Sequence, residues 1–269
     1  MILDMKGEVL TMALNWDIVI VSHNAKEYLI KCLESLKFVT PKKVIVVDNA
    51  STDGTLPWLV SCSPNIQIVL NKENLGYSRA CNIGVALTAS PIIGLLNMDC
   101  AFTEDIAPML EYLENNSDIG CIGPKQVDSA NRIRYAGTFF EKCGMKTLHG
   151  SYHRGWEEID DVNKYVDIRA VHYVSGSALF IKREVYYKFG GFDDRLPLYF
   201  EDVLLCLRLQ KAGLRTVYFG KTRMKHEWMK SNNSRERHNR LWKSMAMFRE
   251  LCDKEVISHR LDWFKEHVG

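Results

Sequence analysis

Three apolar runs near the start of the chain each end in polar side chains whose oxygen atoms can bind a ligand. The first ends in Ser-His-Asn at residues 22–24, the second in a polar loop at 48–54, and the third in Asn-Met-Asp at 97–99. Asp48 can accept hydrogen bonds from a base or a ribose. Asp99 can ligate Mg²⁺ or Mn²⁺, because a hard cation needs few protein oxygens when diphosphate oxygens and water complete its shell. We therefore expect a site for a nucleotide diphosphate and a divalent metal.

The elements that would position these side chains alternate as strands and helices do in a βαβ sheet. Short apolar runs typical of buried strands lie at residues 17–21, 44–47, 66–70 and 92–96. Helical patterns lie between and after them, at 25–38 with Asn24 as expected N-cap, 77–89 and 105–114. Parallel sheets bind ligands beyond the carboxyl ends of their strands, so the three polar ends share one rim. Singly, each polar residue is better explained as a turn former or a helix cap, but together they favour a ligand site.

The second half of the chain is less regular. After an apolar run at 119–122, residues 124–166 predict only loops and short strands. Strands are expected at residues 173–181 and 216–219 and a short helix at 183–189. A longer helix is expected at 201–212, ended by Gly213. Apolar residues keep helical spacing from Arg235 to His267, which predicts one long or two shorter amphipathic helices. The predicted organisation is a leader at 1–15, one domain at 16–234 and a basic helical tail at 235–269.

Composition and missing motifs exclude several classes of protein. With 269 residues, 46% of them hydrophobic and 25% charged, the chain can bury a full core, which excludes disorder and coiled coil. No apolar stretch reaches the ~18 residues of a membrane span and the N-terminus does not resemble a signal peptide, so we expect a cytoplasmic protein. Eight cysteines without a CxxC pair indicate reduced, buried thiols. A dinucleotide-binding fold and a P-loop are excluded, because the glycines that each requires are missing.

Charge is unevenly distributed along the chain. Residues 211–269 carry 14 Lys and Arg against 7 Asp and Glu, whereas the whole chain has a net charge of only +2. Such a tail is typical either of a surface that meets an anionic partner or of a solvated helix face. No nucleic-acid motif accompanies it, so we expect no nucleic-acid partner and favour peripheral association with the inner face of the cytoplasmic membrane.

Several segments, in the same order along the chain, resemble family 2 glycosyltransferases of the GT-A fold. They lie at residues 21–24, 46–55, 74–84, 95–99, 190–194 and 199–202, and at His226 followed by Ser231. An ordered set that covers residues 16–234 is far more specific than any one motif. The resemblance implies an α/β protein with a Rossmann-like, mostly parallel central sheet flanked by helices and a C-terminal helical extension. Within the family, the chain is similar to bacterial rhamnosyltransferase-like members that build surface polysaccharides.

The resemblance also implies a role for each matching residue. Asp48 would bind the nucleobase, and the donor site would further contain Ser22, Asn24, Asn49, Arg79, Asn82 and Asn97. Asp99 and His226 would hold Mg²⁺ or Mn²⁺, although Asn97 stands where the family has its first metal-binding acid. Gly176, Asp193 and Asp194 would form part of the acceptor site.

The acidic pair Glu201-Asp202 is the most informative feature of the second half. An acidic pair that opens a helix usually only complements the helix dipole. Here the pair follows Tyr199 and Phe200 and matches the family's motif for the catalytic base. Sugar transfer with inversion needs one carboxylate to take the proton of the acceptor hydroxyl while a metal neutralises the departing diphosphate. We assign Asp202 as the base, with Glu201 positioning the acceptor or acting in its place.

These residues predict an inverting, metal-dependent glycosyltransferase. The donor would be a dTDP- or UDP-linked sugar, with rhamnose as a candidate, and the acceptor a hydroxyl of a glycan or a lipid-linked saccharide in bacterial surface polysaccharide synthesis, lipopolysaccharide included. The alternative is a non-catalytic nucleotide-sugar or glycan-binding component of a polysaccharide assembly complex, because a fold does not guarantee activity. A nucleotidyltransferase is disfavoured, because that chemistry usually needs a Gly-rich basic loop after the first strand.

Overall fold

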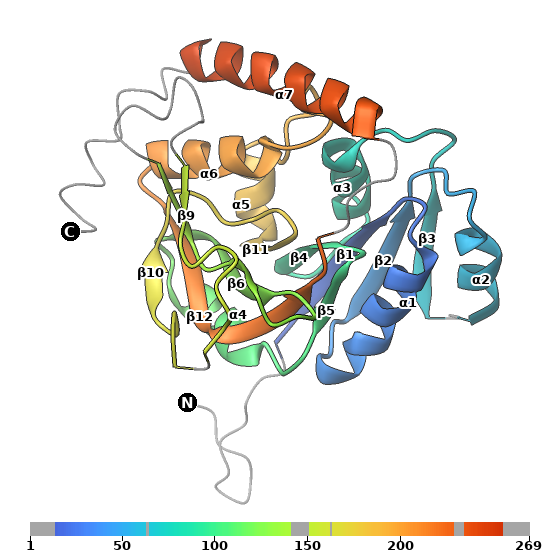
Figure 1. The fold of residues 1–269 in the computed structure, drawn as a ribbon, viewed down its shortest axis with the longest axis horizontal. Helices are drawn as coiled ribbons and strands as arrows, with labels where there is room; N and C mark the ends of the chain where they lie inside the picture. The colour runs from blue at the N-terminus through green and yellow to red at the C-terminus, as the bar shows by residue number, and fades with distance from the viewer. Residues whose placement is uncertain (1–13, 63–64, 141–150, 162, 229–233, 255–269) are drawn as a thin grey trace, which may run out of the picture.

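A mixed sheet forms the centre of the computed structural model, which describes residues 14–62, 65–140, 151–161, 163–228 and 234–254 (Figure 1). Its main path runs in the order β10-β12-β6-β11-β4-β1-β2-β3, with β5 paired to β12 and β7 to β6. The strands are β1 Trp16–Ser22, β2 Lys43–Asp48, β3 Ile66–Leu70, β4 Ile92–Asn97, β5 Cys100–Phe102, β6 Ile119–Val127, β7 Ile133–Tyr135, β10 Ile168–Ala170, β11 Ala178–Lys182 and β12 Arg215–His226. Among the described strands of the main path, β1, β2, β3, β4, β6 and β12 point the same way, which confirms the mostly parallel sheet.

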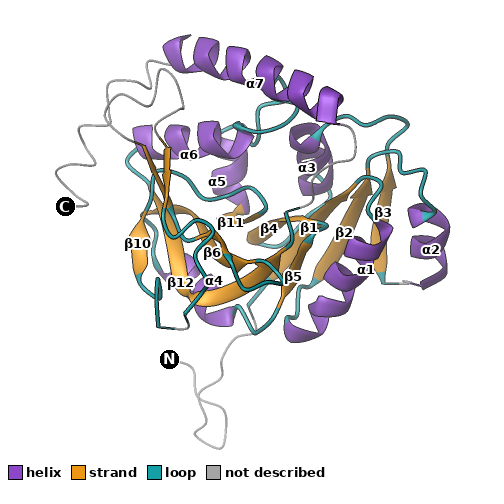
Figure 2. Cartoon of the chain, viewed as in Figure 1, coloured by secondary structure: helices purple, strands orange, loops and turns teal. Residues whose placement is uncertain are grey.

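Helices cover both faces of this sheet, as Figure 2 shows. They are α1 Lys26–Glu34, α2 Thr55–Cys62, α3 Tyr77–Val85, α4 Ala107–Asn115, α5 Arg183–Lys188, α6 Glu201–Lys211 and α7 Ser234–Lys254, with a short 3₁₀ helix at Ser35–Phe38. Side chains alternate along a strand, so Ile18 of β1 belongs to the core cluster that includes α1, α2 and α4, whereas Val19 belongs to the cluster that includes α3, α5 and α6. Both faces of β1 are therefore buried, and its polar residues lie near its two ends.

The structure corrects two predicted elements in the first half and the middle of the chain. Asn24 is not the N-cap of α1: the cap is Ala25, and Asn24 has φ of +48° and accepts a hydrogen bond from Thr52 N at 2.7 Å. The strand expected at 173–181 is shorter, because residues 175–177 form a turn in which Ala178 N donates to Ser175 O before β11 begins.

The last strand is longer than the sequence predicts. The apolar run at 216–219 is only the first part of β12, which continues to His226 after a register shift between Phe219 and Arg223. The strand stays paired with β6 on both sides of this irregularity, and its last residues also pair with β5. His226 thereby lies opposite Cys100, which places the end of β12 beside the end of β4.

The irregular segment after β6 forms short strands, as predicted. Besides β7 and β10, a separate two-stranded sheet pairs β8 (Thr138–Phe140) with β9 (Ser151–His153). Described cysteines are buried and free, as expected, at positions 32, 81, 100, 121, 206 and 252. None of the helices in the described ranges is long and apolar enough to cross a bilayer.

Helix α7 packs onto α6 through its apolar residues. Phe248 stacks on Phe200 with ring centroids 5.3 Å apart, and Leu251 joins the same cluster as Leu204 and Leu207 of α6. Most of the predicted leader and residues 255–269 of the predicted tail lie outside the described residues. The boundaries of the leader, domain and tail therefore stay predictions.

Asp17 anchors the start of β1 and provides a test of the fold. Its buried carboxylate accepts hydrogen bonds from Ala89 N at 2.7 Å, Ser90 N at 2.9 Å and Ser90 Oγ at 2.7 Å. We expect Asp17→Ala to lower the free energy of unfolding by about 2–4 kcal/mol, because it leaves buried N–H groups without an acceptor. Urea denaturation followed by circular dichroism measures this change. If Asp17→Ala lowered the free energy of unfolding as little as the exposed control Glu34→Ala, this expectation would be contradicted.

Candidate active site

Asp48 and Ser22 lie at the carboxyl ends of adjacent parallel strands and keep unused polar atoms. Asp48 is 3% exposed, and its Oδ1 accepts a hydrogen bond from Ser51 N at 2.8 Å. Among the described residues, neither Asp48 Oδ2 nor the buried Ser22 Oγ has a hydrogen-bond partner. Buried polar atoms without partners are costly, so this pair is suited to a ligand that brings donors, such as a base or a ribose.

Asn24 and Asn49 shape the loops around this rim. Asn49 Nδ2 donates to Gly76 O at 3.1 Å, and its Oδ1 accepts from Asn71 Nδ2 at 2.8 Å, which ties β2 to the start of α3. Asn24 Oδ1 is occupied by Thr52 N. Both amides therefore position the loops, and direct contact of either residue with a donor stays a prediction.

Asn82 joins α3 to the loop at 190–194. Its Nδ2 donates to Phe192 O at 2.8 Å and to Asp194 Oδ1 at 2.6 Å, and its Oδ1 accepts from Tyr186 OH at 2.6 Å. These partners occupy the amide, so Asn82 holds the loop, and its expected place in the donor site stays a prediction. Arg79, one turn earlier, is about half exposed and lies 3.8 Å from Asp194.

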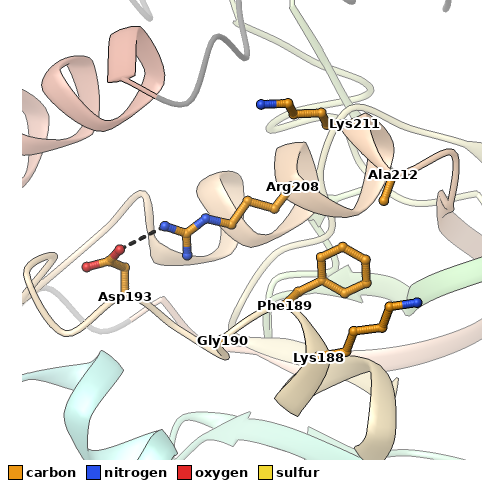
Figure 3. A pocket seen from close by; sticks show the side chains of 7 residues that line it. All are labelled: Lys188, Phe189, Gly190, Asp193, Arg208, Lys211 and Ala212. Carbon is orange, nitrogen blue, oxygen red and sulfur yellow. Dashed lines mark hydrogen bonds and ion pairs between the residues drawn. The ribbon is translucent and has the colours of Figure 1, made fainter.

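Asp193 forms ion pairs with two arginines. Its carboxylate pairs with Arg195 at 2.8 Å and Arg208 at 2.9 Å, and the hydrogen bonds from these residues hold its pKa well below the usual range. Figure 3 shows Asp193 directed at Arg208 across a surface pocket between α5 and α6. The residues that line this pocket belong to neither the Asp99–His226 pair nor the Glu201–Asp202 pair. Asp193 therefore fixes the loop to α6, and its expected place in the acceptor site stays a prediction.

Asp99, Cys100 and His226 form the one cluster of possible metal ligands found among the described residues. Their ligand atoms lie within 4.8 Å of one another, and His226 Nε2 is 3.6 Å from Asp99 Oδ2. His226 Nδ1 hydrogen-bonds to Gln126 Oε1 at 2.8 Å, which turns Nε2 toward Asp99. Burial lowers the pKa of His226 despite the opposing effect of Asp99, so the imidazole is neutral and its nitrogen can ligate. The predicted metal pair is thus brought together across β4 and β12.

Cys100 lies within this cluster, but its thiol is not suited to bind a metal. Its Sγ donates to Ser177 O at 3.3 Å, and burial raises the pKa of its thiol well above the usual range. A thiol ligates metals as the thiolate. Asp99 and His226 are therefore the two protein ligands that the donor atoms support, and they fit a cation whose remaining positions are filled by diphosphate and water.

The acidic pair lies at the start of α6, after Tyr199 and Phe200, which both have positive φ. Glu201 is 5% exposed, and its Oε2 has no hydrogen-bond partner within the described ranges. Burial raises the pKa of Glu201 well above its usual value, and the neighbouring Asp202 raises it further. Burial and the neighbouring charge therefore favour the protonated form of Glu201, and its expected role beside Asp202 stays a prediction.

Asp202 is more exposed than Glu201, and backbone N–H groups donate hydrogen bonds to its carboxylate. Its Oδ2 accepts from Gly176 N at 2.7 Å and its Oδ1 from Val203 N at 2.8 Å. Burial raises its pKa while these hydrogen bonds act against the rise. Asp202 is thus the member of the pair that ionises first and can take a proton.

Gly176 touches Asp202 directly, which the sequence did not indicate. A Cβ at position 176 would lie 3.1 Å from Asp202 Cβ and 3.2 Å from its Oδ2. Tyr77 OH donates to Gly176 O at 2.6 Å from the opposite side. Gly176 therefore positions Asp202, and its expected contact with an acceptor stays a prediction.

The turn at residues 175–177 links the two halves of the site. Ser177 O accepts from Asn97 N at 2.9 Å, and Ser177 Oγ donates to Gln126 Oε1 at 2.8 Å. Gln126 is the residue that orients His226. Sequence reasoning missed Gln126, although a glutamine within the buried strand β6 is a signal that could have identified it.

Comparisons with known proteins agree with this geometry. The model of Glycosyl transferase family 2 matches residues 17–190. The chain is 28% identical to an N-acetylglucosaminyl-diphospho-decaprenol L-rhamnosyltransferase of Mycobacterium tuberculosis over 78% of this chain and 75% of that protein. It is 24% identical to Rhamnosyltransferase WbbL of Escherichia coli K12, over 90% and 95% of the two chains.

Solved structures show the same fold at lower identity. GalNAc-T7, crystallised with UDP, GalNAc and Mn²⁺, has a TM-score of 0.66 at 16% identity, over 80% of this chain but only 44% of that chain. The mannosyltransferase PcManGT of Pyrobaculum calidifontis, in complex with GDP-Man and Mn²⁺, has a TM-score of 0.59 at 15% identity, over 93% and 71%. These likenesses confirm the GT-A fold. Because the family model covers more than half of the chain, this protein belongs to glycosyl transferase family 2 and is a nucleotide-sugar-dependent glycosyltransferase.

Proposed function

We propose that the chain is an inverting, metal-dependent rhamnosyltransferase that acts on a lipid-linked saccharide in the synthesis of a bacterial surface polysaccharide. The observation that carries this proposal is the 175–177 turn, which bonds to Asp202 on one side and, through Gln126, to His226 on the other. A base and a metal-binding pair held by one turn suit a single displacement, in which the nucleophile and the leaving group lie on opposite faces of the sugar.

The chain's own residues account for each part of the reaction. Asp48 and Ser22 offer acceptors to the nucleoside, and Asp99 and His226 would hold the cation beside the diphosphate. When bound, the cation supplies neutralisation of the charge on the leaving diphosphate. Asp202 takes the proton of the acceptor hydroxyl as that oxygen attacks the anomeric carbon. The raised pKa of the buried Glu201 disfavours a second negative charge beside this carboxylate.

The metal-ligating atoms of the site favour a particular cation, and the named relatives favour particular classes of substrate. An imidazole ligand is less suited to Mg²⁺, which takes oxygen ligands, so we favour Mn²⁺, the ion in the GalNAc-T7 and PcManGT structures. The Mycobacterium tuberculosis relative is named for an N-acetylglucosaminyl-diphospho-lipid acceptor and a rhamnosyl product. We propose the same classes here, with a dTDP- or UDP-linked donor.

Membrane contact and cytoplasmic location stay predictions. Phe248 and Leu251 of α7 pack against the α6 cluster, so they would not enter a membrane in this arrangement. Lys243 and Arg249 are exposed on the same helix. A lipid-linked substrate would therefore meet α7 through its basic side chains and not through its apolar ones.

Donor class and metal are tested together by a nucleotide titration. We expect one of UDP, dTDP, GDP and CDP to bind selectively and more tightly with Mn²⁺, and Asp99→Ala to weaken this binding by about tenfold or more. Isothermal titration calorimetry measures both effects, with the exposed Asp118→Ala as a matched control. The absence of binding to every nucleotide would contradict a transferase and favour a glycan-binding component of an assembly complex.

The variant Asp202→Asn, in which an amide replaces the carboxylate, tests the role of Asp202. We expect Asp202→Asn to lower kcat by roughly 10² to 10⁴ while donor binding is retained, because only the proton acceptor is removed. Sugar transfer followed by chromatography of the product measures kcat, and the same nucleotide titration measures donor binding. Unchanged turnover would rule out Asp202 as the base, and Glu201→Gln would then be the variant to assay.

The pH dependence of turnover follows from the same carboxylate. Burial raises the pKa of Asp202 above its ordinary value of 3.8, and only the ionised form accepts a proton. We therefore expect kcat to fall on acidification, by about tenfold per pH unit below a midpoint above pH 4. A steady-state profile at saturating substrates, with circular dichroism to show that the protein stays folded, measures the midpoint. A rate that stays constant down to pH 4 would contradict this assignment.

A further inference from the structure

Two tryptophans lie side by side just beyond the candidate metal site. Trp228 follows His226 by two residues, and Trp156 follows β9. Their ring centroids are 4.3 Å apart with an interplanar angle of 76°. Trp228 is 37% exposed and Trp156 is partly exposed, so this Trp156–Trp228 pair offers aromatic surface to solvent.

The pair is held rigidly against the metal-binding residues. Glu227 N donates to Asp99 O at 3.0 Å, and the Glu227 carboxylate accepts from Ser129 N at 3.3 Å and from the Ser129 hydroxyl. Trp228 itself has φ of +49°, a left-handed conformation that costs energy in a residue with a bulky side chain. The backbone thus maintains an unfavourable conformation at an exposed indole beside the site.

Arg134 supports both rings from one side. Its guanidinium carbon lies 5.5 Å from the Trp156 ring centroid and 5.7 Å from that of Trp228. The guanidinium is also paired with Asp128 at 2.5 Å and with Glu157. Two carboxylates already balance its charge, so this surface is suited to an uncharged ring and not to a phosphate.

The aromatic contacts continue beyond Trp156. The His153 ring lies 5.5 Å from Trp156 and 6.3 Å from Tyr173. The rings of Trp228, Trp156, His153 and Tyr173 therefore follow one another in a row that begins two residues after His226.

We propose that the Trp156–Trp228 pair binds a pyranose ring of the acceptor saccharide by stacking against its C–H face. This inference rests on the proposed transferase function and adds an acceptor subsite to it. An indole offers a large, rigid apolar face at low cost in conformational entropy, and one apolar face of a pyranose matches it. Trp228 is two residues from His226, and Glu227 N bonds to Asp99 O, so the stacked sugar would lie beside the metal-binding residues.

The test uses methyl N-acetyl-β-glucosaminide as the probe and saturation-transfer NMR on the full chain. We expect Trp228→Ala and Trp156→Ala each to weaken binding of this glycoside by roughly fivefold or more, and Trp228→Phe to retain most of it. Trp242→Ala, an exposed tryptophan on α7, is the matched control and should bind as the unchanged protein does. In turnover assays the two alanine variants should raise the KM for acceptor more than they lower kcat.

The outcomes separate this inference from the proposed function. Unchanged glycoside binding in both alanine variants, or no binding by the unchanged protein, would overturn the subsite while nucleotide binding and turnover persist. Loss of glycoside binding in Trp228→Phe as well as Trp228→Ala would also overturn stacking as the cause. Failure of the proposed function would instead appear as an absence of nucleotide binding in every variant, the control included.

Discussion

The hydrogen bond from Gly176 N to the Asp202 carboxylate is the interaction on which the arrangement of the active site depends. It fixes the base against the 175–177 turn, and the same turn bonds to Gln126, which orients His226. A side chain at position 176 would crowd the base, because a Cβ there would lie 3.1 Å from that of Asp202. One turn therefore holds the base and the metal-binding residues relative to one another, through the Gly176 N–H on one side and the side chains of Ser177 and Gln126 on the other.

Burial gives neighbouring ionisable groups different tasks. Glu201 and Asp202 are adjacent, yet Glu201 has a buried oxygen without a partner among the described residues, whereas Asp202 accepts hydrogen bonds from two backbone N–H groups. Desolvation raises the pKa of Glu201 well above its usual value, whereas hydrogen bonds favour the anion of Asp202. The same desolvation keeps His226 neutral beside Asp99. One carboxylate can then act as a base without a second charge competing for the same proton.

The nucleotide rim and the acidic pair come from opposite halves of the chain, and the start of α3 joins them. Gly76, with φ of +85°, approaches Pro197 so closely that a Cβ would lie 2.4 Å from the Pro197 carbonyl oxygen. Tyr77 N also donates to Pro197 O at 3.2 Å, and Ser78 Oγ donates to Leu196 O at 2.5 Å. These bonds hold the loop before α6 against the start of α3, so the Asp48 rim and the Glu201–Asp202 pair belong to one connected framework.

Sequence alone determined the alternating elements of the first half, the polar strand ends and the two acidic motifs. These are local properties, since strand periodicity and residue type at a strand end depend on near neighbours. Tertiary structure decided which of the predicted residues act together. It showed Asn82 and Asp193 bonded within the protein, extended β12 to bring His226 to Asp99, and placed Gly176 against Asp202. Such pairings depend on contacts between residues far apart in sequence, which neither spacing nor composition records.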